Sequence, residues 1–433
     1  MKRLYFTVST IENVCAGFIF LVASGAFQYL ASTVGGEDSR QFSNPTFVEV
    51  LSYLTRFSVV IGVLVLARRV DENLLRRSWP IWLLMGFVAA SYFWSVAPSA
   101  TAEALFRMVP MLLVGIWVLS SKTSVVVKAR LRLLALLILS ANIIAVIAFT
   151  DMSFMQGRHE GAMRGAFRHK NELGVYSVFA LSIFIFIPAD KRHFHFLQIA
   201  LSIVFLALTR SSTSYVCLVV VILTGGGIHL INKAVRGTFA RYGVLLVGAA
   251  VALPLTIVAS SLIEELLPYL GRDLSLSGRT KLWQIAAEAF QQRPLLGNGF
   301  RAFWFSSNPW TNDFAAQQIW KPSHFHNGYI ASAVDGGLAQ ALILAFVIFY
   351  LLATSLGQAF RKEGSQYWPL VASIFLIVYN LSETGFPFDN APFTVIALSV
   401  VAFSKLAAPA AVNGSSVQLG SAQRGSQIAR SLS

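Results

Sequence analysis

Cysteine is nearly absent from this sequence, which excludes disulfide-built and thiolate-metal domains. The 433 residues include only Cys15 and Cys217, each inside an apolar run. Two isolated thiols supply neither a disulfide framework nor a thiolate metal site. No carboxylate stands at zinc-ligand spacing beside His324 and His326, the histidine pair near residue 325. The sequence therefore predicts neither a bound metal nor a cofactor.

Charged residues are also scarce. They make up 12% of the chain, against 55% hydrophobic residues, whereas soluble domains carry about a quarter charged residues. This composition indicates a multi-span membrane protein. The 34 basic and 20 acidic residues leave a net charge of +14, which first suggests basic cytoplasmic loops and then an anionic ligand. Nucleic acid is not an expected partner, because no soluble basic domain exists to bind it.

Long apolar runs predict an all-α polytopic fold, since they are too long and unbroken for barrel strands. The first run, residues 13–36, is longer than the apolar core of a signal peptide and is interpreted as a retained helix. The sequence predicts twelve spans, at 14–34, 47–67, 78–97, 101–119, 132–150, 172–188, 194–210, 212–231, 242–262, 328–352, 367–385 and 390–406.

Basic residues orient these spans. With both termini in the cytoplasm, every predicted inner segment carries at least two of them. The outer loops are uneven, because most of their cations fall in two places: Arg158, Arg164, Arg168 and Lys170 in one loop, and Arg272, Arg279, Lys281, Arg293, Arg301 and Lys321 in another. Positive charge placed against the insertion bias needs a local reason, and binding an anion on the outer face is the simplest.

The chain divides into an integral membrane domain at 1–406 and a low-complexity, disordered cytoplasmic tail at 407–433. Within the membrane domain, residues 262–327 form one long outer loop, which we expect to carry the chemistry. A short amphipathic helix is predicted there, with Ser277 as its N-cap and Pro294 at its end. Its apolar residues recur at helical spacing: Leu282, Ile285, Ala286, Ala289 and Phe290.

Candidate chemistry rests on arginine and histidine. Guanidinium groups at a bilayer edge suit a lipid-linked phosphate, although snorkelling to lipid headgroups is the structural alternative. His326 suits proton abstraction from a sugar hydroxyl, although an interfacial or structurally hydrogen-bonded histidine is the favoured interpretation of this residue taken alone. His324, two residues away, is expected on the other side of an extended segment or far around a helix, so the two are not expected to form one metal site. The span pairs Glu49 with Arg56 and Glu103 with Arg107 are interpreted as structural.

A second polar loop, residues 165–174, precedes the sixth predicted span. It places Arg168, Lys170 and Asn171 at the outer mouth of a helix whose N-terminal N–H groups also favour an anion. The hairpin at 208–213 adds Arg210 and hydroxyl side chains. Together these loops strengthen the prediction of an anion site on the outer face.

Five motifs in order resemble the bacterial O-antigen ligase/polymerase family, and most of all its ExoQ-type exopolysaccharide polymerases. They are Gly-Ala-Phe-Arg-His-Lys-Asn (165–171), Leu-Thr-Arg-Ser-Ser-Thr (208–213), Ser-Gly-Arg-Thr-Lys-Leu-Trp (277–283), Arg-Pro-Leu-Leu-Gly-Asn-Gly (293–299) and His-Asn-Gly-Tyr (326–329). The resemblance covers roughly residues 160–350. It implies a GT-C-like, metal-independent, inverting glycosyltransferase of the bacterial inner membrane, with its active site facing the periplasm.

The resemblance also implies partners and roles. The donor would be a glycan on undecaprenyl diphosphate, and the acceptor a growing polysaccharide or lipid A core; polysaccharide export and chain-length regulator proteins would be further partners. Arg279 and Arg210 would hold the diphosphate, and His326 would act as general base or organise the diphosphate. Arg168, Lys170 and Asn171 would line the donor site, and the other substrate-binding positions would be His324, Asn327 and Arg293. Arg210 stands in Thr-Arg-Ser, where the family more often has Ser-Arg and a small residue.

Three functions remain open at the level of sequence. A polymerase of lipid-linked repeats is favoured, and an O-antigen ligase shares its donor chemistry and differs in acceptor. A polysaccharide flippase or transporter is the alternative from another class. It would be expected to show repeats and broken, polar helices at the membrane midplane, whereas this sequence concentrates its polar groups in outer loops.

Overall fold

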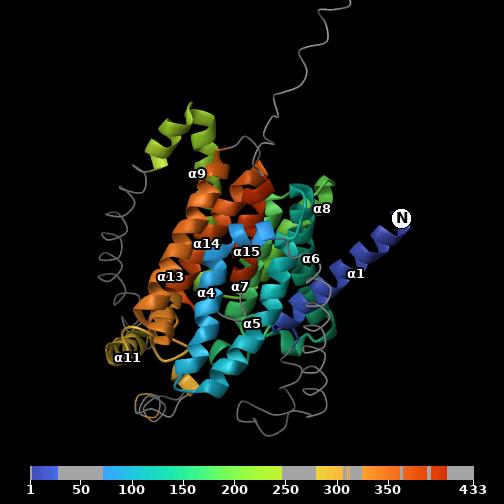
Figure 1. Cartoon of the computed structure of the whole chain (residues 1–433). Coiled ribbons are helices and arrows are strands. Elements are labelled where there is room, and N and C mark those ends of the chain that lie inside the picture. The colour runs from blue at the N-terminus through green and yellow to red at the C-terminus, as the bar shows by residue number, and fades with distance from the viewer. Residues whose placement is uncertain are drawn as a thin grey trace, which may run out of the picture.

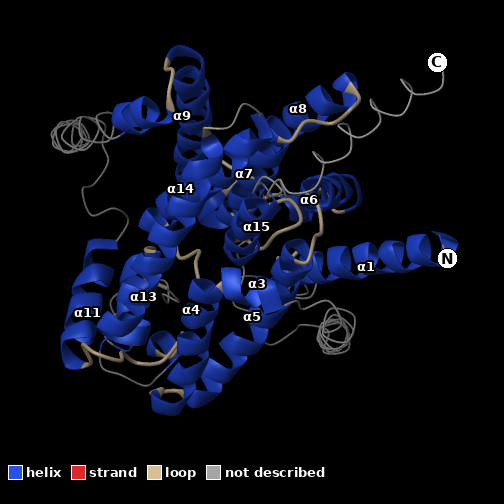
Figure 2. Cartoon of the chain, turned by 45° about the horizontal axis from the view of Figure 1, so that its top comes forward, coloured by secondary structure: helices blue, strands red, loops and turns tan. Residues whose placement is uncertain are grey.

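The computed structural model describes residues 2–27, 72–245, 279–305, 324–360, 364–387 and 392–406, together with Trp310 and Asn312. These residues form a helical bundle without strands, as predicted (Figures 1 and 2). The α-helices are α1 (Lys2–Ala23), α3 (Glu72–Arg77), α4 (Trp79–Ala90), α5 (Pro98–Leu119), α6 (Ser124–Ala148), α7 (Lys170–Phe186), α8 (Arg192–Leu208), α9 (Ser212–Ala234), α11 (Arg279–Gln292), α13 (Gly328–Ala359), α14 (Trp368–Ser382) and α15 (Phe393–Leu406).

Four of these helices, α5, α6, α9 and α13, are long and apolar enough to cross a membrane, and five shorter apolar helices accompany them. The chain is therefore a membrane protein, as its composition indicated. The predicted count of twelve spans stays a prediction, because the span at 47–67 and most of the span at 242–262 lie outside the described residues. So do residues 262–278 of the long loop, which include Ser277, and the tail at 407–433.

Two helices form the centre of the bundle. α15 is buried from Phe393 to Phe403, and α7 is buried from Leu173 to Phe184. A helix that is apolar on every face must be surrounded by other helices or by lipid, and α15 is packed against α5, α13 and α14. Close approach depends on small residues here: a Cβ at Gly115 of α5 would lie 2.5 Å from Leu398 of α15.

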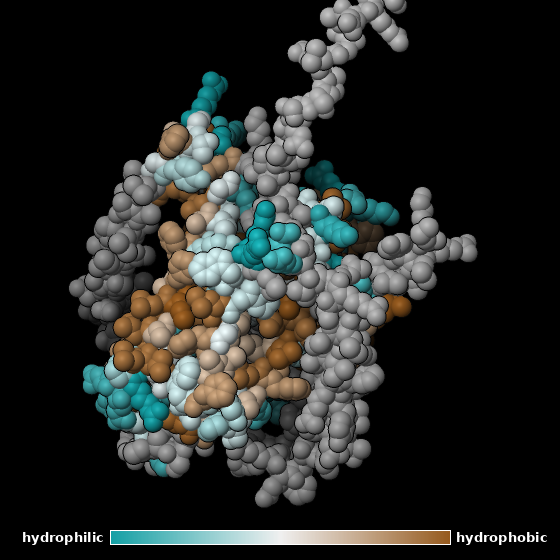
Figure 3. Space-filling view, viewed as in Figure 1, coloured by the Kyte–Doolittle hydropathy of each residue, from teal (hydrophilic) through white to brown (hydrophobic). Residues whose placement is uncertain are grey.

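The periphery is apolar as well. α8 and α9 diverge from their short connection, and both pack against α7 (Figures 1 and 2). They expose Phe196, Val204, Val219 and Leu223. Figure 3 shows a band of apolar side chains across the visible face, with hydrophilic side chains above and below it. Such a band is what a bilayer requires of a helical protein's surface.

α13 is interrupted at Gly337, where φ is +64° and ψ is −161°. The segment at 294–299 inserts into this break. Asn298 N and Gly299 N donate to the carbonyls of Val334 and Asp335, and on the other side of the break Leu338 N donates to Pro294 O. A helix break in a membrane is tolerated only where its backbone groups find partners, and here the chain itself supplies them.

The inserted segment is clamped from its other side. Phe300 N donates to Ser91 Oγ at 2.9 Å, and Thr101 Oγ1 donates to Phe300 O at 2.9 Å. Only glycine fits at Gly297, since φ is +66° and a Cβ would lie 2.6 Å from the backbone of Asp335. The motif Arg-Pro-Leu-Leu-Gly-Asn-Gly (293–299) therefore has a structural role: it fills the break in α13 and connects this helix to Ser91 and Thr101.

Candidate active site

A single carboxylate, Glu383, joins three segments that are far apart in sequence. Its Oε1 accepts from Arg279 Nη2 at 3.2 Å and from Asn171 Nδ2 at 3.2 Å, and its Oε2 lies 3.0 Å from His326 Nδ1. The three partners belong to three of the motifs identified in the sequence. The structure thus brings together residues separated by up to 212 positions.

Glu383 is held by the turn that ends α14. Its backbone N–H donates to Tyr379 O, which continues the last helical turn. The next turn wraps around Asn380, whose Oδ1 accepts from Gly385 N and Phe386 N at 2.9 Å each, while its Nδ2 donates to Phe386 O. Because Asn380 is fully buried, this turn leaves the Glu383 side chain little freedom.

Arg279 is the first residue of α11. The existence of α11 confirms the short helix predicted in the long loop. Its buried side chains are Leu282, Ile285, Ala286 and Ala289, four of the five apolar positions predicted to share one face, and α11 packs against α13. Trp283 Nε1 donates to Phe325 O at 3.0 Å, which ties α11 to the histidine segment. This docking aims the start of the helix at Glu383.

His324 and His326 lie on the same side of their segment, with ring centroids 4.0 Å apart. The expectation that they lie on opposite sides of an extended segment or far apart around a helix is wrong, because His326 has a φ of +51° and the chain there is neither extended nor helical. His326 N also donates to His324 Nδ1 at 3.2 Å. The reversed backbone turns the His326 ring onto Glu383.

His324, His326 and Glu383 could together hold a metal ion, since their ligand atoms lie within 4.8 Å of one another. Two observations oppose this use. Both oxygens of Glu383 already accept hydrogen bonds, and Oε1 is 3.2 Å from the permanently charged guanidinium of Arg279. A divalent cation placed there would be repelled by that charge. His324, His326 and Glu383 therefore fit a hydrogen-bonded chain of side chains better than a metal centre.

Asn171 connects Glu383 to α9. While its Nδ2 donates to Glu383, its Oδ1 accepts from Ser211 Oγ at 3.0 Å, and Ser214 Oγ donates to Ser211 Oγ at 3.0 Å. α7 and α9 approach closely here, since a Cβ at Gly174 would lie 2.0 Å from Ser214 Oγ. The Asn171 side chain is thereby fixed at both ends.

The other predicted cations of this loop lie beside Asn171. Lys170 Nζ donates to the carbonyl of Arg210 at 3.1 Å, and Arg210, with φ +49°, directs Nη1 to Glu160 O at 3.4 Å. Arg168 is half exposed and pairs with Glu172 at 3.8 Å. Lys170 and Arg210 thus adjoin Asn171 and Ser211, the two residues that link Glu383 to α9 by hydrogen bonds. Arg168 instead pairs with Glu172.

Two predicted substrate-binding residues occupy other places. Asn327 caps α13: its Oδ1 accepts from Tyr329 N and Ile330 N, and its Nδ2 donates to Leu381 O, each at 3.0 Å. It therefore positions its neighbour His326. Arg293 follows α11 at the end opposite Arg279, roughly 20 Å along the helix axis, and is exposed. The structure does not bring Arg293 to Glu383.

The Glu383 carboxylate is buried more deeply than the side chains of Arg279 and His326 that contact it. The Glu383 side chain is 7% exposed, whereas those of Arg279 and His326 keep 24% and 23%. Burial by itself would raise the pKa of Glu383, but the hydrogen bond with His326 and the nearby His326, His324 and Arg279 lower it below its ordinary value. Glu383 is therefore an ionised acceptor at neutral pH, and the accessible groups are a guanidinium and an imidazole.

Two further histidines are neutral at this site. Burial, with His326 nearby, lowers the pKa of His324 to about 3. Burial also lowers the pKa of His169, the N-cap of α7, to about 4, and His159 adds to this effect. Both rings act as hydrogen-bond acceptors for backbone N–H groups, of His326 and Asn171 respectively.

The sequence analysis missed Glu383. A signal was present, because the predicted span at 367–385 contains an acidic residue, and an ionisable residue in a span is a functional candidate by default. Glu383 stands at the outer end of this predicted span, on the same side of the membrane as the predicted outer loops that carry the unusual cations.

Comparison with known proteins bears out the resemblance. Residues 197–345 match the family model described as O-antigen ligase. The chain is also 26% identical over 311 residues to the exopolysaccharide production protein ExoQ of Rhizobium meliloti (strain 1021), which covers 66% of this chain and 67% of that protein. The matched region includes Arg210, Arg279 and His326 of the candidate site.

Proposed function

We propose that this protein is an inner-membrane glycosyltransferase that polymerises undecaprenyl-diphosphate-linked oligosaccharides at its periplasmic face. The observation that carries the proposal is the convergence of Arg279, His326 and Asn171 on Glu383. A carboxylate-held imidazole beside a partly exposed guanidinium supplies a base and an anion site in one place. Transfer of a glycan from a diphosphate carrier needs both.

His326 is the proposed general base. An ionised Glu383 can only accept hydrogen bonds, so His326 Nδ1 carries the proton between them and Nε2 is the basic nitrogen of the neutral ring. Nε2 takes the proton from an acceptor hydroxyl as that oxygen attacks the anomeric carbon from the face opposite the leaving group. The new C–O bond forms as the bond to the diphosphate oxygen breaks, and the configuration inverts. Glu383 stabilises the resulting imidazolium.

Arg279 is the proposed partner of the leaving diphosphate. Fixed cations stabilise charge that develops on a departing oxyanion, and they do so best where water is scarce. Lys170 and Arg210 add positive charge at the adjoining start of α7, where the first backbone N–H groups also favour an anion. This arrangement lets side chains do what a divalent ion does in other transferases, so the proposed reaction is metal-independent.

A ligase is the second candidate, supported by the description of the matching family model. The relationship to an exopolysaccharide production protein supports the polymerase. Both reactions use the same donor chemistry and differ in the acceptor. With both termini in the cytoplasm, the site would face the periplasm, where growing polysaccharide and lipid A core are available and where export or chain-length regulator proteins would act.

The test is transfer by the purified full-length protein in liposomes, with an undecaprenyl-diphosphate oligosaccharide, a chelator and no added metal. Wild type is compared with Arg279→Ala and His326→Ala, and with His193→Gln, an exposed histidine of α8, as control. Lengthening chains from wild type and the control, lost in both site variants, would support the polymerase. Single transfer to a lipid A core acceptor would identify a ligase. Movement of intact lipid-linked glycan without new glycosidic bonds would identify a transporter and overturn the proposal.

A further inference from the structure

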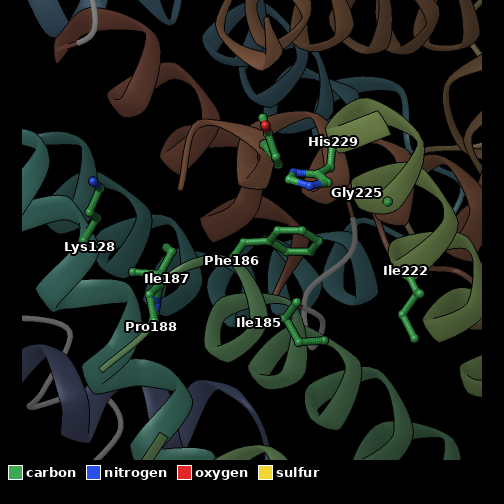
Figure 4. A pocket seen from close by; sticks show the side chains of 10 residues that line it. Lys128, Ile185, Phe186, Ile187, Pro188, Ile222, Gly225 and His229 are labelled. Carbon is green, nitrogen blue, oxygen red and sulfur yellow. The ribbon is translucent and has the colours of Figure 1, made fainter. Parts of the chain in front are cut away.

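A groove of about 790 Å³ lies at the end of the bundle away from Glu383. Phe186 lies at its centre, with Lys128 on one side and His229, Gly225 and Ile222 on the other (Figure 4). The remaining lining comes from Ile185, Ile187, Pro188, Gly226 and Tyr367. The candidate active site uses none of these residues.

The groove exists because two neighbouring helices have different lengths. α7 and α9 begin side by side, where Ser211 bonds Asn171, but α7 has 17 residues and α9 has 23. α9 therefore runs about 9 Å further. Pro188 follows the end of α7, since proline cannot continue a helix. Gly225 lets α9 pass over Phe186, because a Cβ there would lie 2.1 Å from the ring.

The far end of α9 is fixed away from α8. Asn232 Nδ2 donates to Ala359 O at 2.8 Å, and Arg241 Nη1 donates to Phe360 O at 2.9 Å, so this end is tied to the end of α13. α8 instead packs on α6 and α7. α9 also exposes Ile222 and Leu223 beside the groove. In a bilayer these exposed apolar side chains face acyl chains, and the groove is open to them.

The groove has an apolar part and a polar end. Lys128 lies five residues into α6 and His229 five residues before the end of α9, so both are roughly 7 Å from a helix terminus. Ile222 lies about 10 Å deeper along α9 than His229. None of the described residues that line the groove is acidic. An occupant with a negative head and apolar tails matches this gradient.

We propose that this groove binds an anionic phospholipid, with its phosphate near Lys128 and an acyl chain along Phe186 and Ile222. An ammonium group at headgroup depth attracts a negatively charged lipid, and the aromatic and aliphatic wall accepts the chain. The site is independent of the transfer reaction. It would hold a structural lipid at the end of the bundle away from Glu383.

The experiment is native mass spectrometry of the full-length protein in detergent, titrated with phosphatidylglycerol or with phosphatidylcholine of the same acyl chains. Gly226→Leu fills the groove, because nothing lies within 4 Å of a Cβ at this position. Gly227→Leu is the matched control, since it has the same free space but does not line the groove. Lys128→Gln removes the cation, and Lys122→Gln removes a similar charge outside the lining.

Wild type, Gly227→Leu and Lys122→Gln should retain one phosphatidylglycerol about fivefold more tightly than phosphatidylcholine. Lys128→Gln should lose this preference, and Gly226→Leu should lose the retained lipid. Equal affinity of wild type for the two lipids would overturn the proposal. So would the same retention in Gly226→Leu and Gly227→Leu, because lipid would then be bound elsewhere.

Discussion

His326 Nδ1 lies 3.0 Å from Glu383 Oε2, across 57 residues of sequence. The contact requires a left-handed backbone at His326, a capped start of α13 at Asn327 and a closed turn after α14 at Asn380. Such a constellation resembles the way a carboxylate orients a catalytic histidine in hydrolases. Its consequence is a His326 ring with a fixed orientation and a partly exposed side chain.

Glu383→Gln should lower glycan transfer about 100-fold while the protein still folds. The amide is nearly isosteric but neutral, so it no longer favours the Nδ1-protonated ring or stabilises the imidazolium. Initial rates of chain extension measure the effect, and size-exclusion profiles check folding. Glu103→Gln, which removes a carboxylate from the exposed pair with Arg107 on α5, should leave the rate unchanged. A rate for Glu383→Gln within threefold of wild type would contradict the assigned role.

Arg279→Lys should retain activity between those of wild type and Arg279→Ala. Lysine keeps the charge but lacks the planar fork that can contact Glu383 and a phosphate together. We expect kcat/KM for the lipid-linked donor to fall about tenfold in Arg279→Lys and at least about 100-fold in Arg279→Ala. Arg192→Lys, at the exposed start of α8, is the control. Equal activity of Arg279→Lys and Arg279→Ala would contradict this expectation, because the positive charge that lysine retains would then contribute nothing to transfer.

The protein should lose thermal stability between pH 6.5 and pH 5. His324 and His169 have pKa values of about 3 and about 4 in the folded protein, below the unfolded value of about 6.5. The unfolded state therefore binds more protons in this range, and stability falls as pH falls. For His324 the loss at pH 5 is at most about 2 kcal/mol.

Glu383, whose pKa is also lowered, contributes with the same sign at lower pH. Fluorescence-monitored melting at several pH values measures the effect. His324→Gln should flatten the pH dependence, whereas His193→Gln should not. An unchanged slope in His324→Gln would contradict a neutral, buried His324.

Gly297→Ala should destabilise the fold, because a left-handed φ costs a Cβ-bearing residue about 1–2 kcal/mol and the new Cβ would lie 2.6 Å from the backbone of Asp335. Gly337→Ala should act in the same way, with its Cβ 2.3 Å from Leu295 C. Gly86→Ala is the control, since nothing lies within 4 Å of its Cβ and alanine favours a helix. Melting temperatures below wild type for the first two only would confirm that the inserted segment holds the α13 break.

This break bears on the transporter alternative, since a discontinuous helix is one of its expected features. Here the backbone groups freed at Gly337 form hydrogen bonds with the segment at 294–299, so the chain itself fills the interruption. The proposed reaction site lies instead at the start of α13, at His326. The inserted motif supports that end of the helix.

Much of this protein follows from local pattern. Composition alone indicates a membrane protein, because 55% hydrophobic residues with only 12% charged residues is not typical of a soluble domain. Residue spacing predicted the buried face of α11. It also predicted the ion pair between Glu103 and Arg107, in which Oε1 and Nη1 lie 3.1 Å apart. Both predictions depend only on helical periodicity. The chemistry of arginine and histidine also singled out Arg279 and His326 before their positions were known.

Only the tertiary structure decided what these residues contact. Glu383, on a short turn after α14, gave no periodic signal, and its role comes from the packing of α7, α11, α13 and α14 at one end of the bundle. The same applies to the pairing of His324 with His326, which depends on a backbone reversal that spacing does not reveal. Local patterns report helical periodicity and polarity, whereas contacts across 57 to 212 residues depend on how whole helices pack.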